Sequence, residues 1–317
     1  MIAQFILNST AKTRKDNTTG FIIQTIFQLL RKAYLLINQN ALIKYKLENV
    51  EIVLPLKHDL PIMKRNYPTY DTHIGRIPGY IKRKYSDFQV VDIGANVGDS
   101  AIIIKSKVDL PILCIEADDY YYSLLEKNTK NIGAIGYEKK YVGESKISDL
   151  KLVQFKGTAR LVKENKPDSG IRFYSINEII EKHPSFNKVK FLKIDTDGFD
   201  CKIIRASTDY LMLTTPVIFF EYDPYFLSIL NDDGLSVFEV LKELGYEGAL
   251  IYDNTGSYLL SLRLEQNITL KELHTYFSGW KSVRYMDICV FHHVDMDVFE
   301  NARLKEIDFF EKLKNQG

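Results

Sequence analysis

Residues 88–100, with the sequence FQVVDIGANVGDS, constrain the fold more than any other part of this chain. Residues 89–93 are largely apolar and predict a short strand, and a turn flanked by Gly94 and Gly98 follows it. Asp99 then opens an apolar run that can begin a helix. Glycine lets the backbone turn sharply and approach a ligand closely, and a helix N-terminus offers free N–H groups. This succession predicts the first unit of a nucleotide-binding α/β fold.

The spacing of the turn distinguishes two kinds of cofactor site. A dinucleotide fingerprint needs the pattern G-x-G-x-x-G, and Asn96 stands where its second glycine would be. The pattern D-x-G-x-N-x-G instead resembles motif I of the S-adenosylmethionine-dependent methyltransferases, in the variant typical of the FkbM family. The alternative is a strand-to-helix turn that binds no ligand. Over this motif and the end of the next strand, the resemblance implies the cofactor-binding residues Asp92, Gly94, Ala95, Asn96, Gly98, Asp99, Glu116, Ala117 and Asp118.

A second apolar run, residues 110–115, predicts the neighbouring strand, and Glu116 follows it directly. A carboxylate at the end of this strand can accept hydrogen bonds from both hydroxyl groups of a ribose. Its distance from Gly98 is close to the roughly 20 residues expected for that role. We therefore expect Glu116 to hold a nucleoside ribose beside the glycine turn.

The helix expected over residues 120–127 begins with three consecutive tyrosines. Asp118 and Asp119 precede it and are expected to cap its first turn. The tyrosines offer either an aromatic face to adenine or ordinary packing in the core and at the surface. The sequence leaves both interpretations open.

The composition is that of an ordinary globular protein. The chain has 317 residues, of which 45% are hydrophobic, and a formal net charge of +1. A near-neutral chain lacks the basic footprint of a nucleic-acid-binding protein, so we expect no nucleic-acid partner. The three cysteines lie in apolar runs without metal-ligand spacing, which favours buried thiols in a reducing compartment. No run is apolar over the about 20 residues that a membrane span requires, and we identify no secretory signal.

The chain is expected to divide into an N-terminal helical extension, residues 1–48, and a methyltransferase domain, residues 49–317. Residues 1–20 are mostly polar and are expected to be poorly ordered. Residues 21–47 carry apolar side chains at helical spacing within a region rich in Lys and Arg. Such a helix can pack on the domain or on a second subunit of a homo-oligomer. Alternatively, it can lie on an anionic membrane as a peripheral contact.

The segment between this extension and the first motif is expected to be irregular. Residues 50–56 predict a strand, and residues 58–76 hold prolines and tyrosines that favour loops or short helices. The resemblance implies that this segment forms part of the wall of the cofactor site. His58 and His73 within it are expected at the surface rather than as ligands.

Residues 189–204, VKFLKIDTDGFDCKII, contain the second informative motif. Lys193 and Asp195 are expected on one side of a strand that lies beside the first strand. Asp195 and Asp197 then leave this strand at the sheet edge where ligands bind in such folds. The pattern K-I-D-x-[DE]-G-x-[DE] resembles the second signature of FkbM proteins. The alternative is a strand end whose aspartates only cap the following helix.

A third acidic cluster follows residues 216–220, which predict another strand. Glu221, Tyr222 and Asp223 end it, as in the corresponding signature of the same family. Asp195 and Asp223 are candidate ligands of Mg²⁺ or Ca²⁺, because both ions prefer oxygen. Alternatively, one carboxylate is the general base for a hydroxyl group, with Lys193 held in an ion pair. A solvated acidic rim is the third interpretation.

Four ordered motifs across residues 50–293 resemble the FkbM family, and they imply its fold. This fold is α/β, a Rossmann-like class I methyltransferase with a seven-stranded, mostly parallel sheet, an antiparallel last strand and helices on both faces. The remaining patterns agree with alternating strands and helices. Strands are expected at residues 249–252, 258–264 and 286–291, and helices at residues 173–183, 231–245, 270–277 and 295–314.

The resemblance implies transfer of a methyl group from S-adenosylmethionine to a hydroxyl group of a sugar in a glycan, a surface polysaccharide or a natural product, with Mg²⁺ as a candidate second cofactor. Asp195, Asp197, Asp223 and Lys193 are the catalytic candidates, which would orient or deprotonate the acceptor. Two rival functions stay open: a dinucleotide-dependent oxidoreductase and a non-catalytic module that only binds the cofactor. We expect a cytoplasmic enzyme with peripheral contact at the inner membrane face.

Overall fold

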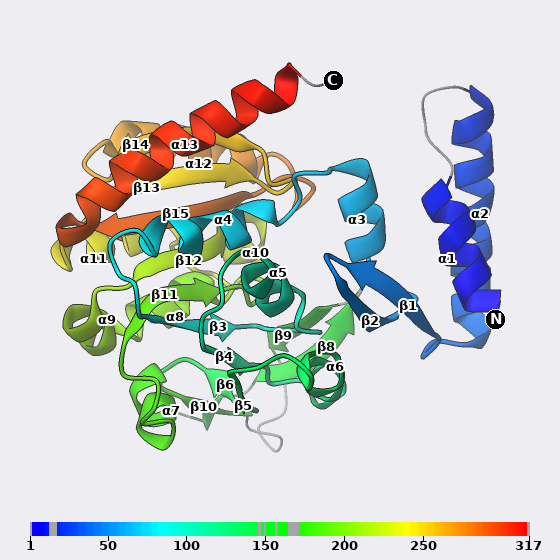
Figure 1. Ribbon diagram of the computed structural model, residues 1–317, viewed down its shortest axis with the longest axis horizontal. Helices are drawn as coiled ribbons and strands as arrows, with labels where there is room; N and C mark the ends of the chain where they lie inside the picture. The colour runs from blue at the N-terminus through cyan, green and yellow to red at the C-terminus, as the bar shows by residue number, and fades with distance from the viewer. Residues whose placement is uncertain are drawn as a thin grey trace.

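The computed structural model describes residues 2–12, 18–144, 147–148, 150–155, 158–163 and 171–315. An eight-stranded sheet forms its centre, in the order β14-β13-β15-β12-β11-β3-β4-β5 (Figure 1). Strands β5, β4, β3, β11 and β12 run parallel to one another, and β15 is antiparallel to both β12 and β13. The strands are Gln89–Ile93 (β3), Ile112–Ile115 (β4), Ile135–Glu138 (β5), Val189–Ile194 (β11), Val217–Tyr222 (β12), Tyr246–Asp253 (β13), Tyr258–Arg263 (β14) and Met286–His292 (β15).

The strand order reverses between β3 and β11. From β3 the chain proceeds outward to β4 and β5, and it later returns to β11 on the other side of β3. Crevices for ligands form at such a reversal, outside the carboxyl ends of the parallel strands. The glycine turn after β3 and the acidic segment after β11 therefore lie side by side, as the sequence predicts.

The Rossmann-like methyltransferase fold expected from the sequence is confirmed, with one strand more than expected. Strand β11 lies beside β3 as expected, and β15, the last strand in the chain, is antiparallel to its neighbours β12 and β13. The eighth, β14, pairs antiparallel with β13 at the edge of the sheet. A strand was expected over residues 258–264, although the seven-stranded fold that the resemblance implies does not include it.

Helices cover both faces of the sheet and enclose two apolar cores. Val91, Ile93, Leu192 and Ile194 face one core, which α7, α8, α11 and α12 close, whereas Val90 and Phe191 face the other, under α4, α5 and α13. This alternation is the period of two expected for a sheet buried on both faces. The helices are Ile2–Lys12 (α1), Thr18–Ile37 (α2), Leu60–Asn66 (α3), Thr72–Ile81 (α4), Asp99–Lys107 (α5), Asp119–Thr129 (α6), Ile176–Lys182 (α7), Asp200–Arg205 (α8), Thr208–Thr214 (α9), Pro224–Ile229 (α10), Ser236–Glu243 (α11), Asn267–Ser278 (α12) and Met296–Lys314 (α13), with a 3₁₀ turn, η2, at His293–Asp295.

The N-terminal region differs from the expectation in two places. Residues 2–12 form helix α1, although poor order was expected there. The helix expected over residues 21–47 ends at Ile37, and strand β1 (Leu42–Leu47) pairs with β2 (Val50–Pro55) as a hairpin. In β1 the side chains alternate between buried Ile43 and Leu47 and exposed lysines, which is a strand pattern. No helix within the described residues is long and apolar enough to cross a membrane.

Short strands complete the fold beside β5. Tyr141–Val142 (β6), Ile171–Tyr174 (β10) and Ile147–Ser148 (β7) form a small mixed sheet in the order β6-β10-β7. Leu150–Phe155 (β8) and Thr158–Lys163 (β9) form a separate hairpin. Residues 135–165 are thus rich in strands where the structure describes them. The three cysteines are buried free thiols, also as expected.

Candidate functional site

The turn between β3 and α5 is held in a conformation that its sequence favours. Gly94, Asn96 and Gly98 all have positive φ, at 78°, 47° and 87°. Asn tolerates this region better than most residues, which explains why it can replace a glycine here. At Gly94 a Cβ atom would lie only 1.8 Å from the carbonyl oxygen of Asp195. The absent side chain therefore lets the β3 turn contact the end of β11 directly.

Glu116, at the end of β4, is tied to this turn. Its Oε2 accepts a hydrogen bond from the Asn96 N–H at 2.8 Å, and its Oε1 accepts one from the Asp118 N–H at 2.9 Å. Burial raises the pKa of Glu116 to about 7, although the two backbone donors oppose the shift. The carboxylate therefore lies beside the turn with a fixed orientation and with lone pairs left for a ligand.

Two cavities open at the carboxyl ends of the strands. Cavity A, of about 590 Å³, is lined by Glu116 and Ala117 together with an apolar wall. Phe173 and Phe199 in that wall stack with ring centres 6.2 Å apart. The other apolar or aromatic residues of the wall are Ile93, Ile115, Tyr141, Val142 and Ile203. A carboxylate facing an apolar slot provides both surfaces of a nucleoside: hydrogen bonds for the sugar and a stack for the base.

Cavity B, of about 820 Å³, is strongly acidic. It shares Gly94, Asn96, Asp195 and Asp197 with cavity A, so the two cavities meet between the β3 turn and the end of β11. The other ionisable or polar residues of its lining are His58, Tyr70, Asp71, Asp99, Ser100, Lys193, Glu221, Asn254, Tyr285 and Asp287. The segment before the first motif, expected in the wall of a cofactor site, thus lines cavity B and contributes no residue to cavity A.

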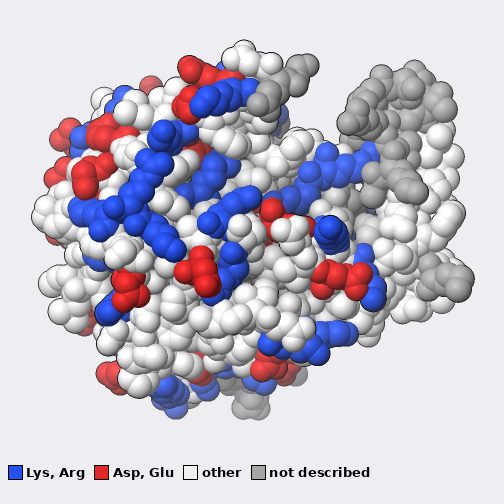
Figure 2. All heavy atoms as spheres, viewed as in Figure 1, with Lys and Arg blue, Asp and Glu red and all other residues white. Residues whose placement is uncertain are grey.

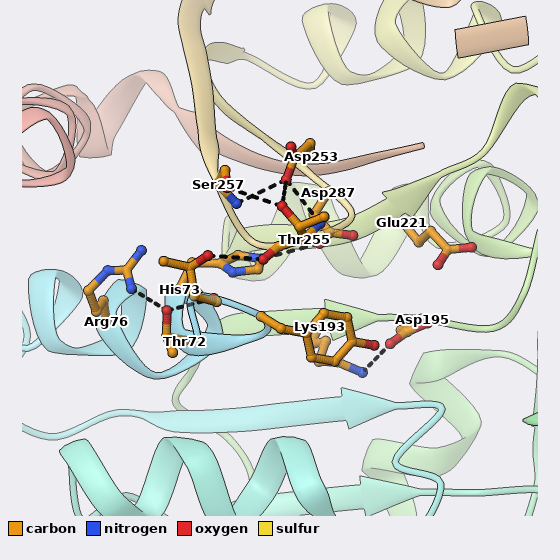
Figure 3. Close-up of polar contacts among 12 residues, drawn as sticks. Thr72, His73, Arg76, Lys193, Asp195, Glu221, Asp253, Thr255, Ser257 and Asp287 are labelled. Carbon is orange, nitrogen blue, oxygen red and sulfur yellow. Dashed lines mark hydrogen bonds and ion pairs between the residues drawn. The ribbon is translucent and has the colours of Figure 1, made fainter. Parts of the chain in front are cut away.

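Lys193 is a buried cation between two carboxylates. Its Nζ lies 3.1 Å from Asp92 Oδ1 and 3.2 Å from Asp195 Oδ2, and its side chain is 2% exposed. Burial alone would lower the pKa of Lys193, but Asp195 and Asp92 outweigh burial and raise it. The ion pair that was expected for Lys193 is therefore present, and Figure 3 shows its contact with Asp195. Ser100 donates a hydrogen bond to the second Asp92 oxygen, so Asp92 connects β11 to the first turn of α5.

The carboxylates of cavity B lie in a medium that disfavours their charge. Burial raises the pKa of Glu221 and of Asp287 well above the ordinary values, and the charge of Asp195 adds to both shifts. Burial and the Asp99 charge act in the same way on Asp71. Raised carboxylate pKa values bring proton exchange toward neutral pH, where a general base is most effective.

Asp200, at the start of α8, holds the loop after β11 in place. It accepts hydrogen bonds from the Thr196 hydroxyl at 2.9 Å and from the Glu221 backbone N–H at 3.3 Å. Burial and the Asp195 charge raise the pKa of Asp200 to about 8. This residue connects the ends of β11 and β12, and the sequence interpretation did not single it out.

Some of the predicted site residues line a cavity and others do not. Gly94, Asn96, Glu116, Ala117, Lys193, Asp195, Asp197 and Asp99 line a cavity, whereas Asp92, Ala95, Gly98, Asp118 and Asp223 line neither. Asp92 and Gly98 instead shape the β3–α5 turn. Asp118 accepts hydrogen bonds from the N–H groups of Tyr120 and Tyr121 and thereby caps α6. This is the capping role that the sequence predicted for it.

Asp223 is the one of the four catalytic candidates that lines neither cavity. Its Oδ1 accepts the Tyr225 N–H at 2.9 Å, which makes it the N-cap of α10, and Ser282 donates to its Oδ2. Glu221, two residues earlier, lines cavity B instead. Residues two apart in a strand share a face, but β12 ends at Tyr222, so Asp223 lies outside the strand and caps α10 instead.

The two histidines that precede the first motif are less exposed than expected. His73 is fully buried, stacked on Tyr252, and its Nε2 lies 3.3 Å from Asp287 Oδ2. Burial lowers the pKa of His73 to about 3, so the ring is neutral. His58 is half-buried and lines cavity B. Tyr120, Tyr121 and Tyr122 line neither cavity, and the aromatic wall comes from Tyr141, Phe173 and Phe199 instead.

Asp287 is a lining residue that sequence reasoning missed. It lies on β15, which runs antiparallel to β12, so the beginning of β15 reaches the edge where the parallel strands end. The acidic residue in YMDICVFHH was a usable signal, because a closing antiparallel strand brings its first residues to the ligand edge. Within the described residues, no group of three or more His, Cys, Asp or Glu side chains has the geometry to hold a metal ion.

Comparison with protein families matches residues 92–247 to the Methyltransferase FkbM domain. The comparison with curated proteins finds no significant match. Similar solved structures include precorrin-6y C5,15-methyltransferase from Geobacter metallireducens, at 14% identity and a TM-score of 0.33, covering 65% of this chain and 80% of that chain. An O-methyltransferase from Bacillus cereus in complex with SAH has 11% identity and a TM-score of 0.36, covering 69% of this chain and 80% of that chain.

Proposed function

The chain carries a methyltransferase domain of the FkbM family, and we propose that it methylates a hydroxyl group of a sugar in a glycan, a surface polysaccharide or a natural product. The protein is an S-adenosylmethionine-dependent methyltransferase. What the proposal adds is the acceptor class and the roles of individual residues. The observation that carries it is cavity B, which adjoins the glycine turn and is lined by carboxylates, tyrosines and an asparagine amide.

The residues around cavity A fit S-adenosylmethionine. Both Glu116 oxygens are fixed by backbone donors, which orients the remaining lone pairs for the two ribose hydroxyls. The stacked Phe173 and Phe199 with Val142 offer an apolar slot for adenine. Gly94 and Asn96 of the glycine turn line both cavities, so the backbone of this turn would lie beside the methionine part. When bound, the cofactor supplies an electrophilic methyl group on a sulfonium ion.

The junction of the two cavities is where the acceptor would meet that methyl group. Asp195 and Asp197 belong to both linings. Lys193 holds Asp195 at 3.2 Å and so fixes the direction of its carboxylate. Asp195 would accept a hydrogen bond from an acceptor hydroxyl and align its oxygen for in-line attack, and such positioning supplies much of the rate in group transfer.

Glu221 is the residue we assign as general base. It lines cavity B, no cation lies within ion-pair distance of its carboxylate among the described residues, and burial raises its pKa. Glu221 would accept the proton that the acceptor hydroxyl loses when its oxygen is methylated. Asp195 is already engaged in the ion pair with Lys193 at 3.2 Å, so we assign it to positioning the acceptor rather than to proton transfer.

Sugar acceptors suit this lining because carboxylates, phenols and amides bind hydroxyl groups by directed hydrogen bonds. Asp71, Glu221 and Asp287 are acceptors for several hydroxyls at once, and Tyr70 and Tyr285 can donate in return. A site built to hydrogen-bond a hydroxyl rejects the analogue that lacks it by large factors, because buried polar groups are then left unpaired. Removing a single hydroxyl group from the acceptor is therefore expected to lower the rate of methyl transfer strongly.

The test is a methyl-transfer screen with labelled S-adenosylmethionine. Mono- and oligosaccharides are compared with their deoxy analogues and with catechols and amines of similar size, each with and without Mg²⁺. The proposal predicts label in a sugar and none in its matching deoxy compound. Transfer to amines or catechols alone would contradict the sugar assignment. Cofactor binding without transfer to any acceptor would favour the non-catalytic module.

A further inference from the structure

Helix α2 presents an apolar face that nothing in the described part of the chain covers. Ile22, Ile26, Leu29 and Leu36 are between 48% and 81% exposed, and Ala33 is exposed between them. We call these five residues the α2 seam. Ile23, Leu30 and Ile37 flank it and are exposed as well. Exposed apolar surface of this extent indicates an interaction site.

The opposite face of α2 is already occupied. Arg31 donates to the Leu56 carbonyl at 2.8 Å and pairs with Asp59 at 2.9 Å, and its side chain is 15% exposed. Phe27 contacts Phe5 of α1 with ring centres 6.1 Å apart. Tyr34 and Leu35 pack on the core that the hairpin β1–β2 shares with α5 and α6. Since these contacts fix the rotation of α2, the seam must point away from the domain.

Figure 1 shows where helix α2, which carries the seam, lies in the molecule. Helices α1 and α2 stand at one end of the molecule, beyond β1 and α3, and α2 forms the outer edge. In Figure 2 the described part of that edge is mainly white, whereas acidic and basic side chains alternate over the rest of the visible face. The face is therefore reachable by a partner that approaches along the helix.

The spacing of the seam indicates what the partner is. The seam residues follow one another at intervals of four, three, four and three, which is the a/d repeat of a coiled coil. The flanking Ile23, Leu30 and Ile37 repeat every seven residues, at e positions. A strict period of 3.5 keeps a narrow stripe facing another helix, and the small Ala33 permits close approach of the two backbones.

The charges argue against a lipid surface as the partner. Helices that lie on anionic membranes carry Lys and Arg along their polar face. In α2 the charged residues are Arg31 and Lys32, and Arg31 is turned into its own domain. The seam thus has the pattern of helix packing without the basic flank of a membrane-bound helix.

We propose that the α2 seam is a self-association surface, on which the same helix of a second copy of this chain packs about a two-fold axis. An isologous contact of this kind buries the stripe of both copies at once and closes without leading to a filament. The seam lies on the face of α2 opposite Arg31, whose guanidinium donates a hydrogen bond at 3.3 Å to the carbonyl of His58, a residue of the cavity B lining.

The test is sedimentation velocity on the full chain over a range of micromolar concentrations. Wild type is expected to sediment as a dimer, and Leu29→Glu as a monomer or with a dissociation constant raised at least about tenfold, since it places a charge in a packed interface. The matched control is Leu304→Glu on α13, an equally drastic exchange at a comparably exposed leucine, 64% against 59%. The control is expected to remain dimeric.

A monomeric wild type, or a Leu29→Glu variant that dimerises like wild type, would overturn the proposal. Flotation with vesicles of phosphatidylglycerol and phosphatidylcholine is run in parallel. Flotation of a monomeric wild type that Leu29→Glu abolishes would assign the seam to a lipid surface instead. Unfolding curves and S-adenosylhomocysteine binding of both variants should equal those of wild type, which would exclude misfolding as the cause of dissociation.

Discussion

Glu221 of β12 and Asp287 of β15 are direct cross-strand neighbours in an antiparallel pair, and both line cavity B. Like charges in such positions destabilise each other. Burial raises the pKa of both residues, and the Asp287 charge adds to the shift at Glu221. The pair can therefore retain a proton at a pH where isolated carboxylates have lost theirs. This relationship places a proton acceptor next to the position proposed for the acceptor hydroxyl.

Replacing Glu221 by Gln should reduce kcat for methyl transfer by about 10²- to 10⁴-fold, the usual contribution of a general base. Binding of S-adenosylhomocysteine should change little, because Glu221 lies outside cavity A. Asp223→Asn is the matched control: it also converts an acid to its amide, yet Asn preserves the N-cap of α10. Equal losses of activity in the two variants would show that Asp223, not Glu221 alone, takes part in the chemistry.

Gly94→Ala should destabilise the protein by several kcal/mol. The new Cβ would meet the backbone of Asp195 at 1.8 Å, and its φ of 78° already disfavours any side chain. Urea unfolding measures the effect. At Gly133 a Cβ would meet nothing within 4 Å, so Gly133→Ala should leave stability within about 1 kcal/mol of wild type. A Gly94→Ala variant as stable as this control would contradict the close approach of the two loops.

Lys193→Met should cost about 3–5 kcal/mol, because it leaves the buried Asp92 carboxylate without its cation. Adding Asp92→Asn to this variant should recover part of the loss, since the uncompensated charge is then removed. Denaturant curves of the single and double variants form the measurement. If the double variant is less stable than Lys193→Met by the full cost of Asp92→Asn alone, the two residues do not interact as described.

Binding of S-adenosylhomocysteine should weaken below neutral pH through Glu116. Burial raises its pKa to about 7 in the free protein. A ribose diol and two backbone N–H groups all need hydrogen-bond acceptors. The ionised Glu116 carboxylate is therefore the form that binds S-adenosylhomocysteine. Protonation would consequently weaken binding about tenfold between pH 8 and pH 6, for a pKa near 7. The same shift makes Glu116 destabilising above pH 7, a cost that disappears as the pH falls toward the unfolded pKa.

Glu116→Gln serves as the control for this pH dependence. Its amide does not titrate, so its weaker affinity should be flat over the same range. Competing titrations are avoided by comparing the two proteins in identical buffers. An affinity for wild type that does not change between pH 6 and pH 8 would be inconsistent with the assigned role.

The sequence predicted those parts of the site that depend on neighbouring residues or on strand order. The β3 turn and Glu116 come from a local motif and its expected spacing, and the place of β11 beside β3 follows from the topology of the fold. The N-cap role of Asp223 also had a local signal, because Pro224 occupies the first helical position.

What could not be predicted depends on contacts between distant segments. The aromatic wall of cavity A combines Tyr141, Phe173 and Phe199, which come from three separate parts of the chain. Asp287 reaches cavity B only through the pairing of β15 with β12. Likewise, residues 42–47 satisfy a helical period nearly as well as an alternating one, and only the hairpin with β2 decides between them.

Calorimetric titration with S-adenosylhomocysteine, on wild type and Glu116→Ala, tests the central claim most directly. Wild type should bind with micromolar affinity, and Glu116→Ala should weaken binding at least about 100-fold, since it removes the acceptor of both ribose hydroxyls and releases the Asn96 N–H. Folded wild type that shows no binding, or equal binding by the two proteins, would contradict the cofactor site described here.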